Sequence, residues 1–383
     1  MAKSPDIRVQ HGEERRLLLA ALREPASIVR LPPRELDLTL RVARRARLLG
    51  RLARGVRDAN LLSRLPQVAQ DALVGAQAIC DSRARVARWE LNRIAWALRD
   101  ETDLPLVALK GSAYLLADLP NAAGRLFADV DLLVPEETLP RVESRLAACG
   151  WRAAELTPYD ENYYRVWTHE LPPMTHVERE VEVDLHHNVL MRTARLRPDA
   201  RLLLAEARRV EGSRFAVLAP VDMVLHAMAH LFYGGEMDDA LRELVDIDDL
   251  LRHFAACEPG FWDRFWPRAM QLDLACPAFY GLRYAHGLLG TPVPSAVLEA
   301  SRGAAPSGPV LSLMDRLVPE ALFPQHPDAH RRRAVLARLA LLARSHWVRM
   351  PPLLLARHLA YKLYVRHFGR GLPDSDQPAA DAN

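Results

Sequence analysis

Residues 104–135, LPLVALKGSAYLLADLPNAAGRLFADVDLLVP, alternate between strand and helix patterns within one short stretch of the chain. LPLVAL is a short apolar run that predicts a buried strand, and it ends at Lys110, Gly111 and Ser112. The next segment, AYLLADL, has helical character, and DVDLLV alternates polar and apolar residues as a strand does. The stretch therefore predicts a strand, a glycine turn, a helix and a second strand.

Two aspartates mark the second of these strands. Asp129 and Asp131 are separated by one residue, so on a strand their side chains point to one face while Val130 points to the other. Paired carboxylates bind hard divalent cations, although D-x-D alone is also common on half-exposed strands and loops. Here apolar residues flank the pair, and burying two carboxylates is costly unless a cation compensates them. We therefore expect Asp129 and Asp131 to be metal ligands.

The clearest period-two run in the chain is VEVDLH, which predicts a further strand. Glu182, Asp184 and His186 share one face of it. A strand placed beside the aspartate pair would bring a third carboxylate to the same site. We expect Asp184 to be that carboxylate, as a metal ligand and general base, with Glu182 as the alternative. His186 is either an assisting group or a structural hydrogen-bond partner.

The glycine turn offers a place to bind phosphate. Gly111 lets the backbone approach phosphate oxygens closely, the Ser112 hydroxyl can donate to one, and the start of the following helix favours an anion. Lys110, one of only three lysines in the chain, can act as a point charge. Lys-Gly-Ser is also an ordinary turn and helix N-cap. Arg125 either binds phosphate or pairs with Asp129 to hold the loop.

These residues carry a resemblance to a known family. The stretch from residue 106 to 135 resembles the uncharacterised nucleotidyltransferases of the DNA polymerase beta superfold. That family typically shows an apolar strand ending in Lys-Gly, and then an arginine four residues before a D-x-D-L-L-V strand. The later EVDLHHNVL is similar to its third-strand pattern. The matching positions are Lys110, Gly111, Arg125, Asp129, Asp131, Asp184 and His186.

The resemblance covers roughly residues 75 to 255 and is most specific between residues 109 and 134. It implies an α+β (α/β) fold, with a polymerase beta-type core of one small mixed sheet and helical regions on both sides. It also implies Mg²⁺-dependent use of a nucleoside triphosphate, with Mn²⁺ as an alternative metal. Ser112 often varies in this branch, so it is a less secure ligand than the aspartates. The family's acceptors are mostly unestablished.

The hydrophobic pattern divides the chain into four regions. Residues 1–100 and 196–370 show helical periodicity, and residues 101–195 contain the strand patterns. The polar tail, residues 371–383, predicts disorder. We expect an N-terminal helical region, a nucleotidyltransferase core and a C-terminal helical region. The leucine- and arginine-rich segment 331–370 either packs as the last core helices, which we favour, or lies on a membrane.

Composition excludes several classes of protein. The 383 residues carry 51 basic and 48 acidic side chains, so no global field indicates nucleic acid or an anionic membrane as partner. Four cysteines without C-x-x-C spacing indicate neither a zinc knuckle nor a disulfide framework, and we expect them in the core. The chain shows no signal-peptide pattern and no apolar run long enough to span a membrane, so we expect a soluble, cytoplasmic protein.

Two further clusters have weaker signals. His226 and His230 have the spacing of a metal pair, but Ala227 stands where the H-E-x-x-H motif requires glutamate, which argues against a zinc peptidase. We expect them to pack near the site or in the core. A second acidic cluster, Asp246, Asp248 and Asp249, is expected on a solvated helix face or in a salt bridge to the N-terminal region.

Together these patterns predict transfer of a nucleoside monophosphate from a nucleoside triphosphate to an acceptor, with release of pyrophosphate. The acceptor is a small molecule, a peptide or the end of an RNA. Two alternatives stay open: an inactive binding or regulatory module that keeps the fold, and a phosphotransferase that uses the same metal site.

Overall fold

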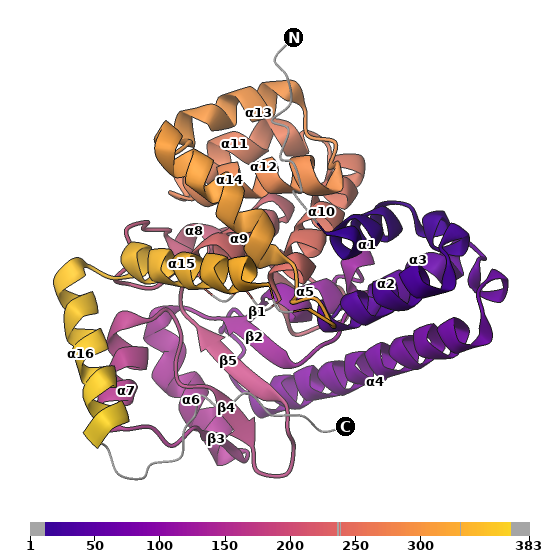
Figure 1. The fold of residues 1–383 in the computed structure, drawn as a ribbon. Helices are drawn as coiled ribbons and strands as arrows, with labels where there is room; N and C mark the ends of the chain where they lie inside the picture. Colours follow the sequence, from indigo (N-terminus) through magenta and orange to yellow (C-terminus); the bar gives the residue numbers. More distant parts are fainter. Residues whose placement is uncertain (1–11, 236, 238, 330, 369–383) are drawn as a thin grey trace.

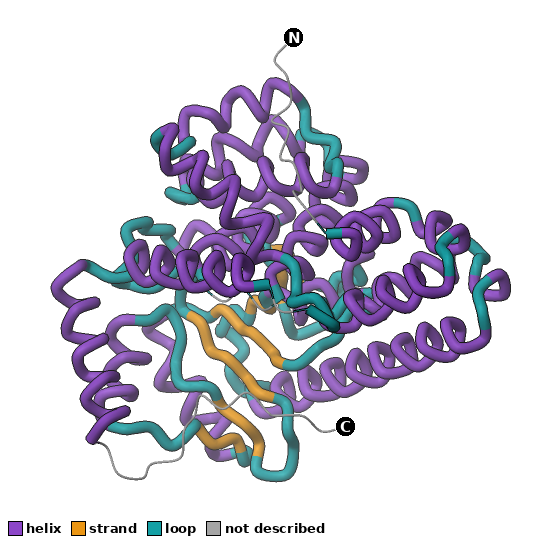
Figure 2. Tube along the Cα trace, viewed as in Figure 1, coloured by secondary structure: helices purple, strands orange, loops and turns teal. Residues whose placement is uncertain are grey.

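The computed structural model describes residues 12–235, 237, 239–329 and 331–368. The strands come from the middle of the sequence and form one mixed sheet, and helices from both ends of the sequence pack around it (Figure 1). The α+β prediction of a small mixed sheet flanked by helices is confirmed. Figure 2 shows how small the share of strand is beside the helices.

The sheet has seven strands in the order β3-β4-β5-β2-β1-β7-β6. Its central pair, β2 and β5, is parallel, as is the pair β1 and β7, and the other neighbours are antiparallel. The strands are β1 (Val107–Ala108), β2 (Asp129–Leu133), β3 (Trp151–Ala153), β4 (Met174–His176), β5 (Glu182–His186), β6 (Arg208–Arg209) and β7 (Ala216–Val217). The last two lie beyond residue 195, so the expected C-terminal helical region also contains two strands that complete the sheet.

The N-terminal region is helical, as predicted. Proline marks the starts of α2 and α4: Pro33 is the first residue of α2, where its fixed φ suits the first turn and its missing N–H costs no helical bond, and Pro66 is the N-cap of α4. The long helix α4 runs beside α3 and reaches the sheet at β2 (Figure 1). The helices are α1 (Glu13–Arg23), α2 (Pro33–Arg45), α3 (Leu49–Asp58) and α4 (Gln67–Ala97).

Three short helices accompany the strands. Helix α5 (Lys110–Leu116) follows β1 directly, α6 (Leu139–Ala148) follows β2, and α7 (Pro158–Asn162) continues into a π-helical turn, Tyr163–Trp167. Helix α6 is followed by Gly150, whose φ of +103° lies in a region that favours glycine.

The C-terminal helices gather around α9, which is buried along nearly its whole length and contacts α10, α11, α12 and α15. The C-terminal helices as a whole are α8 (Ala200–Ala205), α9 (Pro220–Tyr233), α10 (Ala240–Cys257), α11 (Phe261–Gln271), α12 (Ala275–Tyr284), α13 (Ser295–Ser301), α14 (Gly308–Leu322), α15 (Arg332–Arg349) and α16 (Pro352–Phe368). In α15, Ala337 and Leu341 join the core while Leu336 and Leu339 are exposed, so this segment packs on one side only.

A single hydrophobic core extends from the N-terminal helices through the sheet to α15. The division of the chain into N-terminal, core and C-terminal regions therefore stays a prediction. The predicted tail, residues 371–383, lies outside the described residues. Cys80 is buried but Cys257 is exposed, so the expectation of core cysteines is wrong for Cys257. Among the helices of the described part, none combines the length and the apolar character needed to cross a membrane.

Candidate active site

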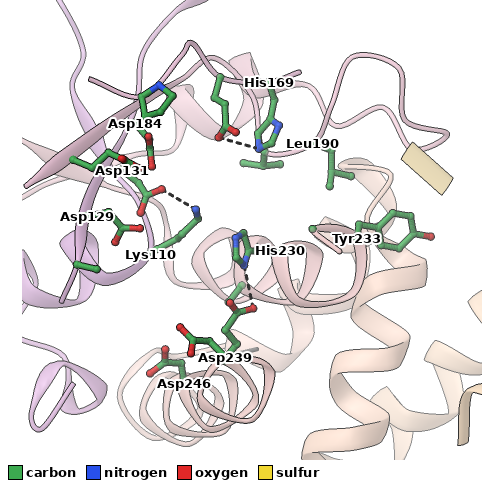
Figure 3. Close-up of a pocket in the computed structure, with 18 of the residues that line it drawn as sticks. Lys110, Asp129, Asp131, His169, Asp184, Leu190, His230, Tyr233, Asp239 and Asp246 are labelled. Atoms are coloured by element: carbon green, nitrogen blue, oxygen red, sulfur yellow. Dashed lines mark hydrogen bonds and ion pairs between the residues drawn. The ribbon is translucent and has the colours of Figure 1, made fainter. Parts of the chain in front are cut away.

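The parallel pairing of β2 with β5 brings the predicted carboxylates together. Asp131 lies opposite Asp184 in the register, and Asp129 lies opposite Glu182. Because alternate residues of neighbouring strands share a face, all four acids project from one side of the sheet. They line a cavity of about 520 Å³ between the sheet and helices α9 and α10. Figure 3 shows Asp129, Asp131 and Asp184 directed into it.

Asp131 is the most buried of these acids, with 1% of its surface exposed. Its Oδ1 accepts a hydrogen bond from Lys110 Nζ at 2.7 Å and lies 3.0 Å from His186 Nε2. Burial alone would raise the pKa of Asp131, but the Lys110 charge and the His186 contact outweigh it and lower that pKa. Asp131 is therefore held ionised and in a fixed orientation.

The other three acids have no such compensation. In the part of the chain that the structure describes, Asp129, Glu182 and Asp184 form no ion pair with any side chain. The pKa of Asp129 is raised by the charge of Asp131 and by burial. Burial first, and then the neighbouring carboxylates, raise the pKa of Asp184 well above its usual range, and burial also raises that of Glu182. The site holds more negative charge than its own cations neutralise.

Lys110 stands at the junction of β1 and α5 with a φ of +43°. This left-handed conformation is uncommon for a residue with a side chain, and such positions concentrate at functional sites. A glycine would adopt it without strain, so the lysine side chain has a use there that offsets the cost. That use, in this structure, is the ion pair with Asp131.

Gly111 has a clear steric role. A side chain on it would clash with the guanidinium of Arg125, which packs against the start of α5. Arg125 is buried, lies over the rings of Tyr114 and Phe127, and donates to Asp246 at 3.1 Å. The two roles expected for Arg125 were phosphate binding and pairing with Asp129. The structure shows a pair, but the partner of Arg125 is Asp246 and not Asp129.

The structure places Ser112 away from the cavity. Its hydroxyl is completely buried in α5 and makes no hydrogen bond within the described residues. Lys110, Arg125, Asp129, Asp131 and Asp184 line the cavity, whereas Gly111 and Ser112 lie behind its wall. The predicted glycine turn is wrong, because Gly111 and Ser112 lie inside α5, which begins at Lys110, and it is Lys110 that has the positive φ. The helix turns the Ser112 side chain into the core.

Comparison with protein families gives one match. The model of an uncharacterised nucleotidyltransferase family matches residues 32–290, well over half of the chain. The chain belongs to this family. No curated protein and no solved structure matches it. The match extends beyond the stretch in which the resemblance was recognised, taking in α2 to α4 and the helices through α12.

A metal ion fits the site of this nucleotidyltransferase family member. Oxygen donors from two strands converge there, and burial makes their mutual repulsion costly without a cation. Asp131, Asp184 and His186 offer ligand atoms that all lie within 4.8 Å of one another. Asp184 is in that group and Glu182 is not, which favours Asp184 over Glu182 as the third carboxylate. Asp129 lines the same cavity but is not in the group, so the structure does not bring its carboxylate as close to the other ligand atoms.

The second acidic cluster is a structural one. Asp249 accepts two hydrogen bonds from Arg51 of α3, at 2.8 and 2.9 Å, so the predicted salt bridge to the N-terminal region is confirmed for that residue. The expectation of a solvated face is wrong for Asp246 and Asp249, because both are buried.

Several cavity residues were missed by sequence reasoning. They come from loops and helices far along the chain, and no motif marked them: Arg47, Tyr164, His169, Glu170, Tyr233, Asp239, Arg242, Glu243 and Arg349. His230, which was expected near the site, lines the cavity and lies 3.0 Å from Glu243 Oε2 through its Nδ1 (Figure 3). His226 is buried beside it in α9.

Proposed function

We propose that this protein transfers a nucleoside monophosphate from a nucleoside triphosphate to an acceptor and releases pyrophosphate, with Mg²⁺ or Mn²⁺ as cofactor. The observation that carries the proposal is the group Asp129, Asp131 and Asp184. Three carboxylates from two parallel strands face one cavity, and two of them, Asp129 and Asp184, form no ion pair in the described part of the chain. Family membership supports the same reaction class.

Asp129, Asp131 and Asp184 would hold the metal. When bound, Mg²⁺ neutralises triphosphate charge and favours departure of pyrophosphate. His186 and Lys110 both contact Oδ1 of Asp131 and fix the direction of this carboxylate. Asp184 accepts the proton of the acceptor hydroxyl. Asp131 then has a positioning and ligand role, and Asp184 has the acid–base role.

The nucleotide-binding roles fall mainly to Lys110. Its ammonium group is already in the cavity, 22% exposed, and a phosphate can take over part of its contact with Asp131. Arg125 and Gly111 support it by fixing the start of α5. Ser112 would contact the nucleotide only if α5 shifted, so it is the least certain nucleotide-binding residue that we propose. The acceptor is a hydroxyl or phosphate group of a small molecule, a peptide or an RNA end.

Calorimetry tests the binding step. We expect ATP, GTP, CTP or UTP to bind the wild-type protein with Mg²⁺ and much more weakly without it. The variant Asp129→Asn/Asp131→Asn should lose the Mg²⁺-dependent part. Asp118→Asn is a matched control, because Asp118 is 98% exposed and its positive φ suits asparagine. Wild-type binding of none of the four nucleotides would refute the proposal.

Labelled ATP separates the reaction classes. With cell extract as the source of acceptor, label from the α-phosphate should appear in a product, and label from the γ-phosphate should leave as pyrophosphate. Transfer of γ-label instead would identify a phosphotransferase. Absence of transfer from all four labelled nucleotides, despite Mg²⁺-dependent binding, would identify a binding module.

A further inference from the structure

We propose that His169, Glu170 and His186 form a second divalent metal site, selective for a borderline cation such as Zn²⁺. This site lies next to the carboxylate group but uses a different donor set. It does not depend on the proposed transfer reaction. Nothing in family membership assigns it.

The donor atoms are already close to one another. Glu170 Oε2 lies 3.3 Å from His186 Nδ1 and 3.8 Å from His169 Nε2. One ligand atom from each of the three residues lies within 4.8 Å of the other two. A tetrahedral Zn²⁺ holds nitrogen and oxygen ligands at about 2.0–2.2 Å, so a small closure of the side chains places all three in its coordination sphere.

The buried imidazole of His186 is the observation that points to a ligand. This residue is 1% exposed, and its Nδ1 makes no hydrogen bond in the described part of the chain, although it faces Glu170. Buried polar atoms are nearly always satisfied, so an orphan nitrogen directed at a carboxylate calls for an explanation. A metal ion between them satisfies both groups.

The backbone holds these ligands in place before any metal arrives. His187 N donates to His169 O at 2.8 Å, and Leu171 N donates to Leu185 O at 2.9 Å. Glu170 forms an isolated bridge with His186 between these two bonds. The ligand-bearing segment is thus fixed against β5, and ligands on paired backbone give a more precise site than ligands on free loops.

The far side of His186 also fits a metal ligand. Its Nε2 lies 3.0 Å from Asp131 Oδ1. Metal-ligating histidines typically donate their other ring N–H to a carboxylate, which fixes the tautomer and strengthens the ligand. Three protein ligands leave one position of a tetrahedral ion open. Imidazole donors distinguish this site from the all-oxygen site that suits Mg²⁺.

Cobalt(II) titration of the full-length protein in excess Mg²⁺ tests the proposal, because Mg²⁺ occupies the oxygen site and leaves the imidazole site for Co²⁺. We expect one Co²⁺ per chain, with visible d–d absorption that Zn²⁺ abolishes by displacement. His169→Gln and Glu170→Gln should each weaken Co²⁺ binding by more than about ten-fold while keeping the wild-type circular dichroism. His253→Gln, on α10, is the matched control and should bind as wild type.

Two results would overturn the site: wild type that binds no Co²⁺ under these conditions, or His169→Gln and Glu170→Gln variants that bind it as wild type does. Asp129→Asn separates this test from that of the proposed function. This variant should lose nucleotidyl transfer but retain the Co²⁺ absorption. Loss of that absorption in Asp129→Asn would show that the metal sits in the carboxylate site, and would also overturn the proposal.

Discussion

The molecule contains two groups of aspartates that look alike in sequence and differ in structure. On α10, each acid has a partner: Asp246 pairs with Arg125, Asp249 with Arg51, and Asp248 with Arg252 at 2.8 Å. Among the described residues of the sheet pair, Asp131 alone of the aspartates forms an ion pair, with Lys110, and its carboxylate also contacts His186.

The difference teaches how to separate structural acids from binding acids. A buried carboxylate whose counter-charge belongs to the protein is complete as folded, and its loss is a loss of stability. A buried carboxylate without a counter-charge is completed by something that the protein binds. Asp129 and Asp184 are half-buried and form no ion pair among the described residues, so we place them with the second kind, and removing them should cost function more than stability.

The largest effect expected from this comparison is on catalysis. Asp129→Asn should lower kcat/KM for nucleotidyl transfer by about 10³-fold or more, because one charge and one ligand leave the reacting centre. Asp248→Asn, in the α10 group and outside the cavity lining, is the matched control and should keep near-wild-type activity. The measurement is release of labelled product from α-labelled nucleotide. Equal losses of kcat/KM in the two variants would show that the sheet aspartates and the α10 aspartates do not differ in function.

The second effect is on stability, and it belongs to the α10 group. Arg125→Met should lower the free energy of unfolding by about 3–5 kcal/mol, because it leaves the buried Asp246 without a partner. Urea denaturation measures this change. Arg88→Met, at a half-exposed arginine, should have little effect. Adding Asp246→Asn to Arg125→Met should restore part of the loss. If the single variant is as stable as wild type, this pair is not structural.

A smaller stability effect is expected where the pair is partly solvated. Asp249→Asn should cost about 1–2 kcal/mol, since Arg51 keeps 30% of its side chain exposed and can recover some hydration. A double-mutant cycle with Arg51→Gln measures the coupling between the two side chains. If the coupling energy is as large as that of Arg125 and Asp246, solvent exposure does not determine how much each pair stabilises the fold.

Sequence patterns predicted which sheet acids share a face because that information is local. Period two along β2 and β5 shows which side chains share a face, and the apolar neighbours of Asp129 and Asp131 show that this face is costly to bury. The parallel pairing of those strands is a long-range property that their local pattern does not show, and the family resemblance implied only a small mixed sheet. The short strands β6 and β7 lacked a pattern long enough to recognise.

The α10 pairs could not be predicted in the same way. Asp246 and its partner are 121 residues apart, and Asp249 and Arg51 are 198 apart. Arginine is so abundant in this chain that no local signal selects one partner over another. The same limit hid Glu170 and His169, which reach the site from a loop whose position depends on its backbone pairing with β5.

The smallest predicted effect is a gain in stability, whereas the other variants should lose activity or stability. Asp184→Asn should raise the free energy of unfolding of the metal-free protein at neutral pH by up to about 1 kcal/mol, because it removes a buried charge among like charges. The change should be visible in urea denaturation with a chelator present. Asp118→Asn should change nothing, and addition of Mg²⁺ should reduce the advantage of the variant over wild type.

The pH dependence of stability is a second, independent test of whether Asp184 destabilises the metal-free fold. The pKa of Asp184 is raised in the folded protein by burial and then by Asp131, so the folded chain binds this proton more tightly than the unfolded chain does. Metal-free wild type should therefore lose stability as pH rises from the ordinary carboxyl pKa through the raised one, and Asp184→Asn should flatten that decline. A variant that is less stable than wild type at neutral pH would place Asp184 with the α10 acids, as a structural group whose partner lies within the fold.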